Sequence, residues 1–211
     1  MVKFVEPLGN INCRIAELMV LPIISYGNGI LRQKCNDIDP NHPDLNQLID
    51  SMWETLYPAD GSGLAAPQIN QSLKLFIVDT QETYSKMDPE DREELFDGDS
   101  GIKETFINAR IVDRSEEYWI ENEGCLSIPS LSEEVERAWG ITIEYFDREL
   151  EPQRKVFKGI TARVIQHEFD HTEGKLYIDH VKPLKLKLLS RKLTKISKGQ
   201  INTKYKMQYP K

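Results

Sequence analysis

Two histidines, His167 and His171, stand four residues apart in the stretch QHEFDH, and Glu168 directly follows the first. On a helix this spacing places both imidazoles on one face, where their nitrogens can bind a single cation. Glu168 would then project beside them as a base for the attacking water. Because short patterns recur by chance, hydrogen-bonded core histidines are the competing interpretation. The motif favours a hydrolytic metal site without establishing it.

A catalytic metal normally has three protein ligands and one open position, so a third ligand must come from elsewhere. One protease pattern places another histidine ten residues after the first, but that position is Tyr177 here. Glu173 and Asp179 follow close to the same helix end and are poorly placed to reach back. The other histidines, His42 and His180, are expected in a loop and beyond the helix. A thiolate is a more attractive ligand.

Cys125 lies in ENEGCLSIPS, where Gly124 permits a close backbone approach and apolar neighbours indicate a partly buried extended segment. A lone cysteine is more often an inert core residue than a ligand. A cysteine protease is a further alternative, but that reaction would leave Glu168 and the second inward histidine without a role. Cys125 is therefore the most attractive third ligand, with both alternatives still open.

The spacing of apolar side chains predicts the elements that position these residues. A helix over residues 159–174 carries the motif, because its apolar stripe of Ile160 and Val164 continues into the two histidines and turns them toward the core. Gly174 suits a C-terminal cap for this helix. Another helix is predicted over residues 45–56, where apolar residues recur with helical spacing before a proline.

Several β-rich segments predict strands between these helices. The predicted strands are LKLFIVDT at 73–80, TFINARIVD at 105–113, and GITIEYFD at 140–147 with a hairpin into RKVF at 154–157. The order predicts an α+β fold, with antiparallel or mixed β-sheets packed around the central HExxH helix, an N-terminal helix and a C-terminal helix.

The composition favours one globular domain that is not exported. With 211 residues, 39% hydrophobic and 29% charged, the chain can bury a substantial core. No apolar run approaches the ~18 to 20 residues of a membrane span, and the N-terminus lacks a signal-peptide core. Three cysteines are too few for a disulfide framework and fit a reducing compartment. We therefore expect a cytoplasmic protein without membrane contact.

Three motifs, GSGLAAPQ at 61–68, EGCLS at 123–127 and QHEFDH at 166–171, resemble those of peptide deformylases, complete and in order. That family removes the formyl group from the N-terminal methionine of nascent bacterial and organellar polypeptides, and the resemblance implies a bacterial protein here. The resemblance implies a metal-dependent hydrolase that acts on N-formylmethionyl nascent peptides and releases formate. A metalloprotease that cuts internal peptide bonds is the alternative. A catalytically silent binding protein is a third, although intact Glu168 and Gln68 argue against it.

Motif positions imply a role for each site residue. The implied ligands of one divalent metal ion are Cys125, His167 and His171. In the family this ion is usually ferrous iron, which zinc, nickel or cobalt can replace. Glu168 is implied as general acid and base, with the Gln68 amide and the Leu126 backbone N–H as donors to the developing oxyanion.

The resemblance also implies where the substrate lies. Gly61 and Gly63 bring the backbone close to the site, so a peptide could lie along GSGLA as an added strand. The implied apolar wall of the methionine pocket is Leu64, Ile160, Val164 and the ring of His167. Arg163 is a less expected neighbour that could alter the pocket mouth. Glu123 and Arg137 occupy positions that pair in relatives, and would brace the cysteine segment.

The expected catalytic domain spans residues 19–199, with an inserted acidic loop or small helical insertion at 81–103. Residues 1–18 form an N-terminal extension, and one interpretation is that translation starts at Met19. Residues 200–211 are expected to be a basic C-terminal tail. We expect a monomer.

The C-terminal region is basic, whereas the body of the chain is acidic. Residues 182–211 contain ten of the 27 Lys and Arg residues and none of the 34 acidic ones. PLKLKLLSRKLTKISKG, from residue 183, reads as a terminal helix with Pro at its start. A packed, solubilising helix is the simpler interpretation. A contact with ribosomal RNA fits both the charge asymmetry and the co-translational work of the family.

Overall fold

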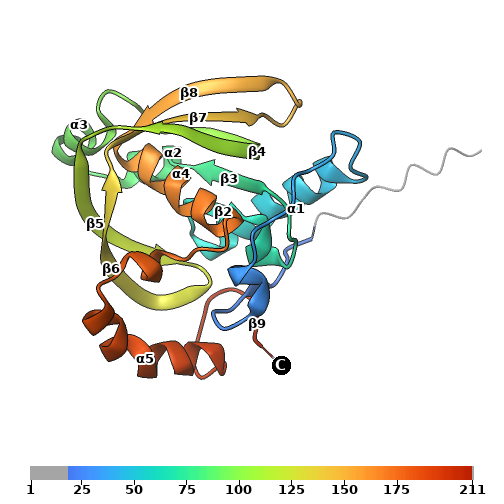
Figure 1. Cartoon of the computed structure of the whole chain (residues 1–211), viewed down its shortest axis with the longest axis vertical. Helices are drawn as coiled ribbons and strands as arrows, with labels where there is room; N and C mark the ends of the chain where they lie inside the picture. Colours follow the sequence, from blue (N-terminus) through green and yellow to red (C-terminus); the bar gives the residue numbers. More distant parts are fainter. Residues whose placement is uncertain (1–18, 211) are drawn as a thin grey trace, which may run out of the picture.

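The computed structural model describes residues 19–210 of the chain, and its elements are arranged around one helix (Figure 1). The predicted N-terminal extension, residues 1–18, lies outside the described residues. None of the helices in the described part is both long and apolar enough to cross a membrane.

The central helix, α4, spans Gly159–Thr172 and carries the HExxH residues. Gly159 has a φ of +55°, and a Cβ there would stand 2.0 Å from the carbonyl oxygen of Leu95, so the helix can start this close to its neighbour only with glycine. At the other end Gly174 has a φ of +72°, the left-handed conformation expected of a C-terminal cap. The predicted helix is therefore confirmed, with its end two residues before Gly174.

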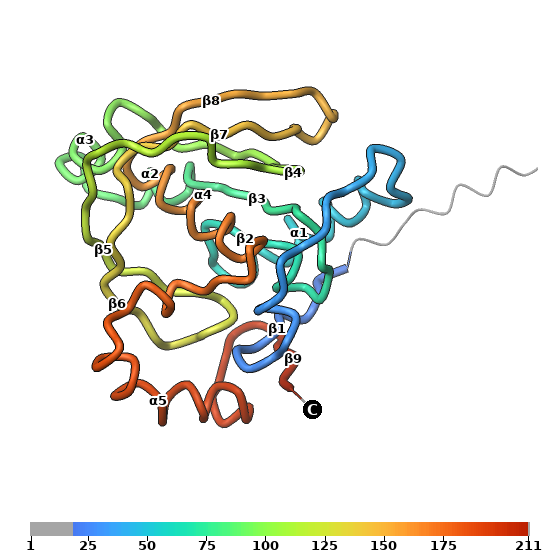
Figure 2. The backbone as a smooth tube through the Cα atoms, in the orientation of Figure 1, coloured from blue at the N-terminus to red at the C-terminus, as the bar shows by residue number. Residues whose placement is uncertain are grey.

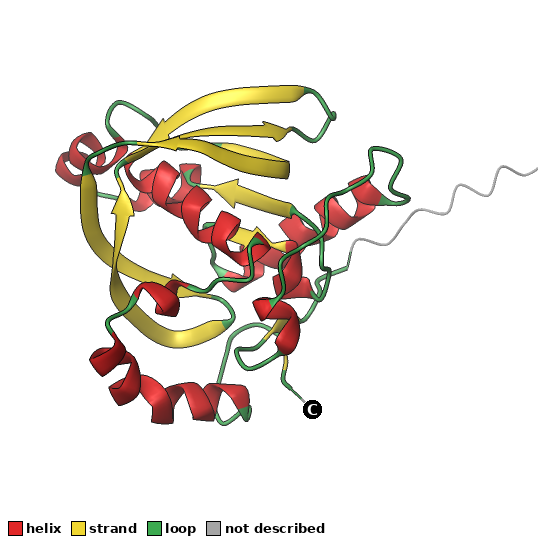
Figure 3. Cartoon of the chain, viewed as in Figure 1, coloured by secondary structure: helices red, strands yellow, loops and turns green. Residues whose placement is uncertain are grey.

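A five-stranded antiparallel sheet covers one side of α4 (Figure 3). Its strands, in spatial order, are β2 (Gly63–Ala65), β3 (Leu75–Asp79), β4 (Lys103–Arg114), β7 (Gly140–Phe146) and β8 (Pro152–Lys158). The alternation in β7 turns Ile141, Ile143 and Tyr145 into the core, as their period of two predicts. All four strands predicted from the sequence are present.

A separate antiparallel hairpin, β5 (Tyr118–Cys125) and β6 (Ile128–Ala138), lies on the other side of α4. Its turn, Leu126 and Ser127, joins the paired residues Cys125 and Ile128. The sequence predicted only an extended segment at Cys125. The hairpin places that cysteine opposite α4, at the end of a strand.

Helix α1 (Leu45–Leu56) has the predicted bounds, and its stripe of Ile49, Met52 and Leu56 is fully buried in the main core cluster. Each such side chain contributes about 1.5 to 3 kcal/mol to folding. Residues 81–103 contain two short helices, α2 (Gln81–Lys86) and α3 (Pro89–Phe96). Short 3-10 helices also occur at Gly29–Arg32, Tyr57–Ala59, Ala66–Ile69 and Tyr177–His180.

The two ends of the described chain meet in a small parallel sheet. Strand β1 (Ile23–Ile24) pairs with β9 (Met207–Gln208), after helix α5 (Pro183–Ser197). Figure 2 shows the blue and red ends of the trace side by side. The predicted basic tail thus folds back onto the body of the protein. With antiparallel and parallel pairing around a central helix, the α+β prediction is confirmed.

Candidate active site

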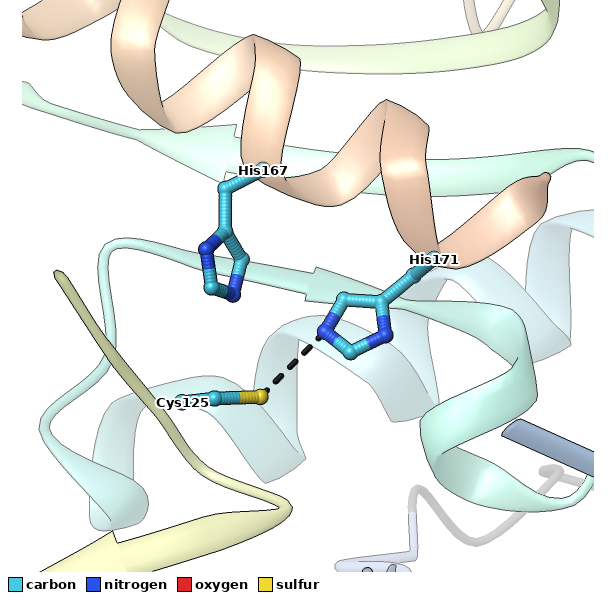
Figure 4. A group of neighbouring side chains, drawn as sticks. All are labelled: Cys125, His167 and His171. Atoms are coloured by element: carbon cyan, nitrogen blue, oxygen red, sulfur yellow. Dashed lines mark hydrogen bonds between the residues drawn. The ribbon is translucent and has the colours of Figure 1, made fainter. Parts of the chain in front are cut away.

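Three predicted ligands converge at the centre of the molecule (Figure 4). Cys125, His167 and His171 each offer one ligand atom, and these atoms lie within 4.8 Å of one another. The Cys125 Sγ is 3.2 Å from the His171 Nε2. The two imidazoles come from successive turns of α4, and the thiol comes from the end of β5. Two imidazoles and one thiol form a donor set that suits zinc, iron and related transition metals, so these residues fit one metal ion.

Glu123 controls the orientation of the first histidine. Its Oε2 lies 2.9 Å from the His167 Nδ1. Burial opposes ionisation of Glu123, but hydrogen bonds from His167 and Arg137 outweigh it and hold its pKa well below the usual value. An ionised carboxylate only accepts hydrogen bonds, so the His167 Nδ1 donates and its Nε2 lone pair is left for a metal.

Arginines hold Glu123 in place. Arg137 donates two hydrogen bonds to it, from Nε at 2.6 Å and from Nη2 at 2.9 Å. Arg137 also donates through Nη1 to Asp170 at 2.8 Å, and Asp170 in turn contacts the Nε2 of His180 at 2.8 Å. Against the effect of burial, His180 and Arg137 lower the pKa of Asp170 to about 2. This buried chain of charges connects α4 rigidly to β5 and β6.

Glu168 has the opposite surroundings, although it is equally buried at 4% exposure. Its Oε2 accepts no hydrogen bond from residues 19–210. The bare backbone of Gly63 makes room for it, since a Cβ at that glycine would lie 2.7 Å from the Glu168 Oε1. Burial raises the pKa of Glu168 to about 7. A carboxylate with this proton affinity can both take and return a proton near neutral pH.

The Gln68 amide is aimed at the thiol by its own backbone contact. Its Oε1 accepts a hydrogen bond from the Ala65 N–H at 2.8 Å, which fixes which way the amide points. The Nε2 therefore faces the Cys125 Sγ at 3.5 Å and the Ser127 Oγ at 3.3 Å. The Gln68 Nε2 is thus positioned to donate a hydrogen bond to a substrate group that binds between this amide and the metal ligands.

A cleft of about 760 Å³ opens onto these residues. Of the residues predicted to touch substrate, its lining includes Gly61, Gly63, Leu126, Ile160, Val164 and His167. Leu64 requires a correction. It is fully buried in the main core and does not line the cleft, because successive side chains of a strand point to opposite faces and Gly63 takes the cleft side.

The model of the polypeptide deformylase family matches residues 20–187 of this chain. A peptide deformylase of Christiangramia forsetii is 44% identical over 194 residues, which cover 91% of this chain and 97% of that protein. The chain belongs to the polypeptide deformylase family. A second peptide deformylase, from Flavobacterium johnsoniae, is 43% identical over 90% of this chain and 96% of its own length.

Solved deformylase structures agree with this membership. The peptide deformylase from Legionella pneumophila is 33% identical, with a TM-score of 0.70, over 86% of this chain and 98% of that one. That from Ehrlichia chaffeensis is 26% identical, with a TM-score of 0.75, over 86% of this chain and 99% of that one. The prediction of a peptide deformylase, a hydrolase, is confirmed, and the metalloprotease alternative is not favoured.

Arg163 lies deeper in this deformylase fold than its sequence position suggested. It lines the cleft, as its sequence position suggested, but it is only 4% exposed and donates to Glu123 at 2.6 Å. It also donates to the carbonyl oxygens of Val135 and Trp119, each at 3.0 Å, and its guanidinium lies 4.2 Å from the Trp119 ring centroid. A buried arginine needs partners that neutralise its charge. Only the fold brings those partners together, so the sequence alone does not predict the burial.

Two further residues were missed by sequence reasoning, and both left a signal. Asp170 stands three residues after His167, on the face of α4 that turns inward. Tyr205, from the C-terminal segment, lines the cleft and donates to the carbonyl oxygen of Leu126 at 2.8 Å. The alternation of polar and apolar residues in KYKMQY, residues 204–209, was the available indication of a strand there.

Proposed function

We propose that this deformylase removes the N-formyl group of formyl-methionyl peptides with Glu168 as its proton carrier. The observation that carries the assignment is the position of Glu168, a buried carboxylate beside three converging ligands at the cleft, whose Oε2 has no hydrogen-bond partner within residues 19–210. Cys125, His167 and His171 would hold a divalent ion, which would supply Lewis-acid activation of the attacking water and the formyl oxygen. Glu168 takes the proton of that water and delivers a proton to the leaving amine. Formate and a free N-terminus are released.

Gln68 and Leu126 stabilise the charge that develops on the formyl oxygen. Gln68 Nε2 is held toward the thiol by the Ala65 contact, and the backbone N–H of Leu126 directly follows the cysteine ligand. Donors fixed in advance need little reorganisation when negative charge appears, which makes them effective in a buried site.

The peptide binds along β2, with its methionine side chain against α4. Strand β2 is the edge of the five-stranded sheet, and its partner β3 occupies only one side of Gly63. An extended peptide can therefore add to the free side by backbone hydrogen bonds. Ile160, Val164 and the His167 ring then provide the apolar wall for methionine.

Ferrous iron is the ion that we propose for the cell, with zinc, nickel or cobalt as replacements. A set of two imidazoles and one thiolate accepts all four metals, so availability decides which is loaded. Metal analysis of protein purified without oxygen should find about one equivalent of iron. Full activity in the absence of iron, from protein isolated with zinc alone, would overturn this assignment.

We further propose a monomer in the cytoplasm that contacts ribosomal RNA through α5. The helix carries Leu184 and Leu188 at 75% and 77% exposure, among lysines that favour an anionic partner. Neutralising these lysines should reduce cosedimentation with ribosomes. Unchanged cosedimentation would argue against the contact. A translation start at Met19 is a separate hypothesis. Detection of peptides from residues 1–18 in the native protein would reject it.

Formate release from a formyl-methionyl peptide tests the enzymatic proposal directly. Protein purified without oxygen should release formate from that peptide and leave an unformylated peptide of the same sequence uncut. Cys125→Ala should lose the bound metal and the activity, because a thiolate ligand is removed. Cys35→Ala is the matched control, since Cys35 is also a free cysteine but lies buried, at 5% exposure, outside the ligand group. Equal metal content in both variants would exclude Cys125 as a ligand.

A further inference from the structure

The C-terminal segment forms part of the wall of the cleft. After α5, Gly199 adopts a φ of +66°, and the chain turns back toward the body. Residues 202–205 then line the same cleft as Cys125, His167 and Glu168. These residues lie beyond residue 187, where the match to the family model ends. The segment therefore adds contacts that the family pattern does not describe.

Tyr205 contacts the turn that follows the cysteine ligand. Its hydroxyl donates to the carbonyl oxygen of Leu126 at 2.8 Å. The backbone N–H of Tyr26, just after β1, donates to the next carbonyl oxygen, that of Ser127, at 2.8 Å. Two successive carbonyls of the turn are thus held by residues that flank the β1–β9 sheet. Gln68 holds the opposite side through Ser127 Oγ.

Tyr205 is itself fixed by the small sheet. The backbone of Ile23 donates to the carbonyl oxygen of Lys206 at 2.9 Å, and Thr203 Oγ1 donates to the carbonyl oxygen of Tyr205 at 2.7 Å. The aromatic ring of Tyr205 is half-buried against the main core cluster. A side chain held at both its backbone and its ring loses little further entropy when its hydroxyl makes a hydrogen bond.

We propose that Tyr205 is a positioning residue for deformylation: through the Leu126 carbonyl it holds the turn that presents both the Cys125 thiolate and the Leu126 N–H. The inference rests on the proposed function, in which that N–H meets the oxyanion. Without the hydroxyl, the turn keeps its other contacts but loses its restraint on the cleft side. Small displacements of such donors lower the rate more than they change substrate affinity.

Tyr205→Phe tests this, because it removes only the hydroxyl. We expect kcat for a formyl-methionyl peptide to fall about three- to tenfold, the fold-change that corresponds to one neutral hydrogen bond, with KM changed less than about twofold. Tyr209→Phe is the matched control. It removes a hydroxyl from the same segment, and that hydroxyl forms no hydrogen bond within residues 19–210, while its ring packs on Gly199.

A cobalt-substituted protein supplies a readout that does not depend on turnover. In Tyr205→Phe the thiolate-to-cobalt charge-transfer band should shift or change in intensity, and in Tyr209→Phe it should match the wild type. An unchanged band together with unchanged kcat would overturn the inference, as would a rise in KM alone. A fall in melting temperature common to both variants, with kcat intact, would assign Tyr205 a purely structural role. Wild-type protein that releases no formate would instead refute the proposed function.

Discussion

Two glutamates of the same site, Glu123 and Glu168, are almost equally buried, at 5% and 4% exposure, yet their surroundings are opposite. Glu123 accepts hydrogen bonds from Arg137, Arg163 and His167. Glu168 faces the bare backbone of a glycine, and its Oε2 has no partner within the described chain. Burial disfavours the ionised form of both, but only Glu123 has donors that outweigh it.

This difference separates a carboxylate that orients its neighbours, Glu123, from a carboxylate that can exchange protons, Glu168. A carboxylate saturated with charged donors keeps its charge and its position, so it can orient a histidine but cannot readily accept a proton. A carboxylate left without donors keeps a high proton affinity and can exchange protons with substrate groups. Burial without partners costs stability, so an unpartnered glutamate beside metal ligands indicates chemistry more strongly than burial alone does.

Glu168→Gln should give the largest effect on activity. The substitution keeps the size of the side chain but removes the proton acceptor, so kcat should fall by about 10² to 10⁴. The free energy of unfolding should stay within about 1 kcal/mol of the wild-type value, because the Glu168 Oε2 has no hydrogen-bond partner to lose within residues 19–210. Formate release and urea unfolding measure the two quantities. Normal turnover by this variant would refute the assignment of Glu168 as the proton carrier.

Gly63→Ala should displace the Glu168 side chain while leaving that residue itself unsubstituted. A Cβ at Gly63 would lie 2.7 Å from the Glu168 carboxylate, which must then move away from the site. Misplacement of a reacting group by about 1 Å can lower the rate by about 10². Gly29→Ala is the control, since nothing lies within 4 Å of a Cβ there, and it should leave kcat unchanged. Equal kcat values for the two variants would show that Gly63 is not needed to position Glu168.

Glu123→Gln should act mainly on stability and metal retention. Two buried guanidinium groups lose their counter-charge, which should cost about 3 to 5 kcal/mol of unfolding free energy. His167 also loses its charged partner, so metal affinity should fall by about 10- to 100-fold. Glu144→Gln is the matched control, because Glu144 also pairs with two arginines but at the surface. That variant should lose about 1 kcal/mol or less. Similar losses of unfolding free energy in both variants would show that burial is not the cause of the destabilisation in Glu123→Gln.

The sequence was informative wherever a pattern is local. The helical spacing over residues 159–174 placed His167 and His171 on one inward face, and the period of two in β7 placed its apolar residues in the core. The three motifs then named the site residues through family resemblance. The convergence of Cys125 with the histidines was inferred from that resemblance and is matched by the geometry.

Long-range partners were beyond the reach of the sequence. The β5–β6 hairpin was missed because only its end at Cys125 carried a recognisable motif. The pairing of β1 with β9 joins residues at opposite ends of the chain, and two-residue strands leave too short a period to detect. The burial of Arg163 was not predicted, because a charged residue on a helix is normally exposed, and only the fold supplies its partner Glu123.

Arg163→Met sharpens the comparison by asking which donors Glu123 needs. The substitution keeps an apolar side chain at the cleft but removes the arginine that donates to the carbonyl oxygens of Val135 and Trp119. It should therefore cost about 1 to 3 kcal/mol of unfolding free energy. Metal affinity should change less than in Glu123→Gln, since Arg137 still donates two hydrogen bonds to that carboxylate.

Arg154→Met is the control for Arg163→Met, because Arg154 pairs with Glu144 at the surface with a side chain that is 67% exposed. Its loss should cost less than about 1 kcal/mol. Urea unfolding and metal titration of both variants separate the two contributions. If Arg163→Met lost metal as readily as Glu123→Gln, orientation of His167 would require both arginines. The two hydrogen bonds from Arg137 would then not be sufficient to hold the Glu123 carboxylate in place.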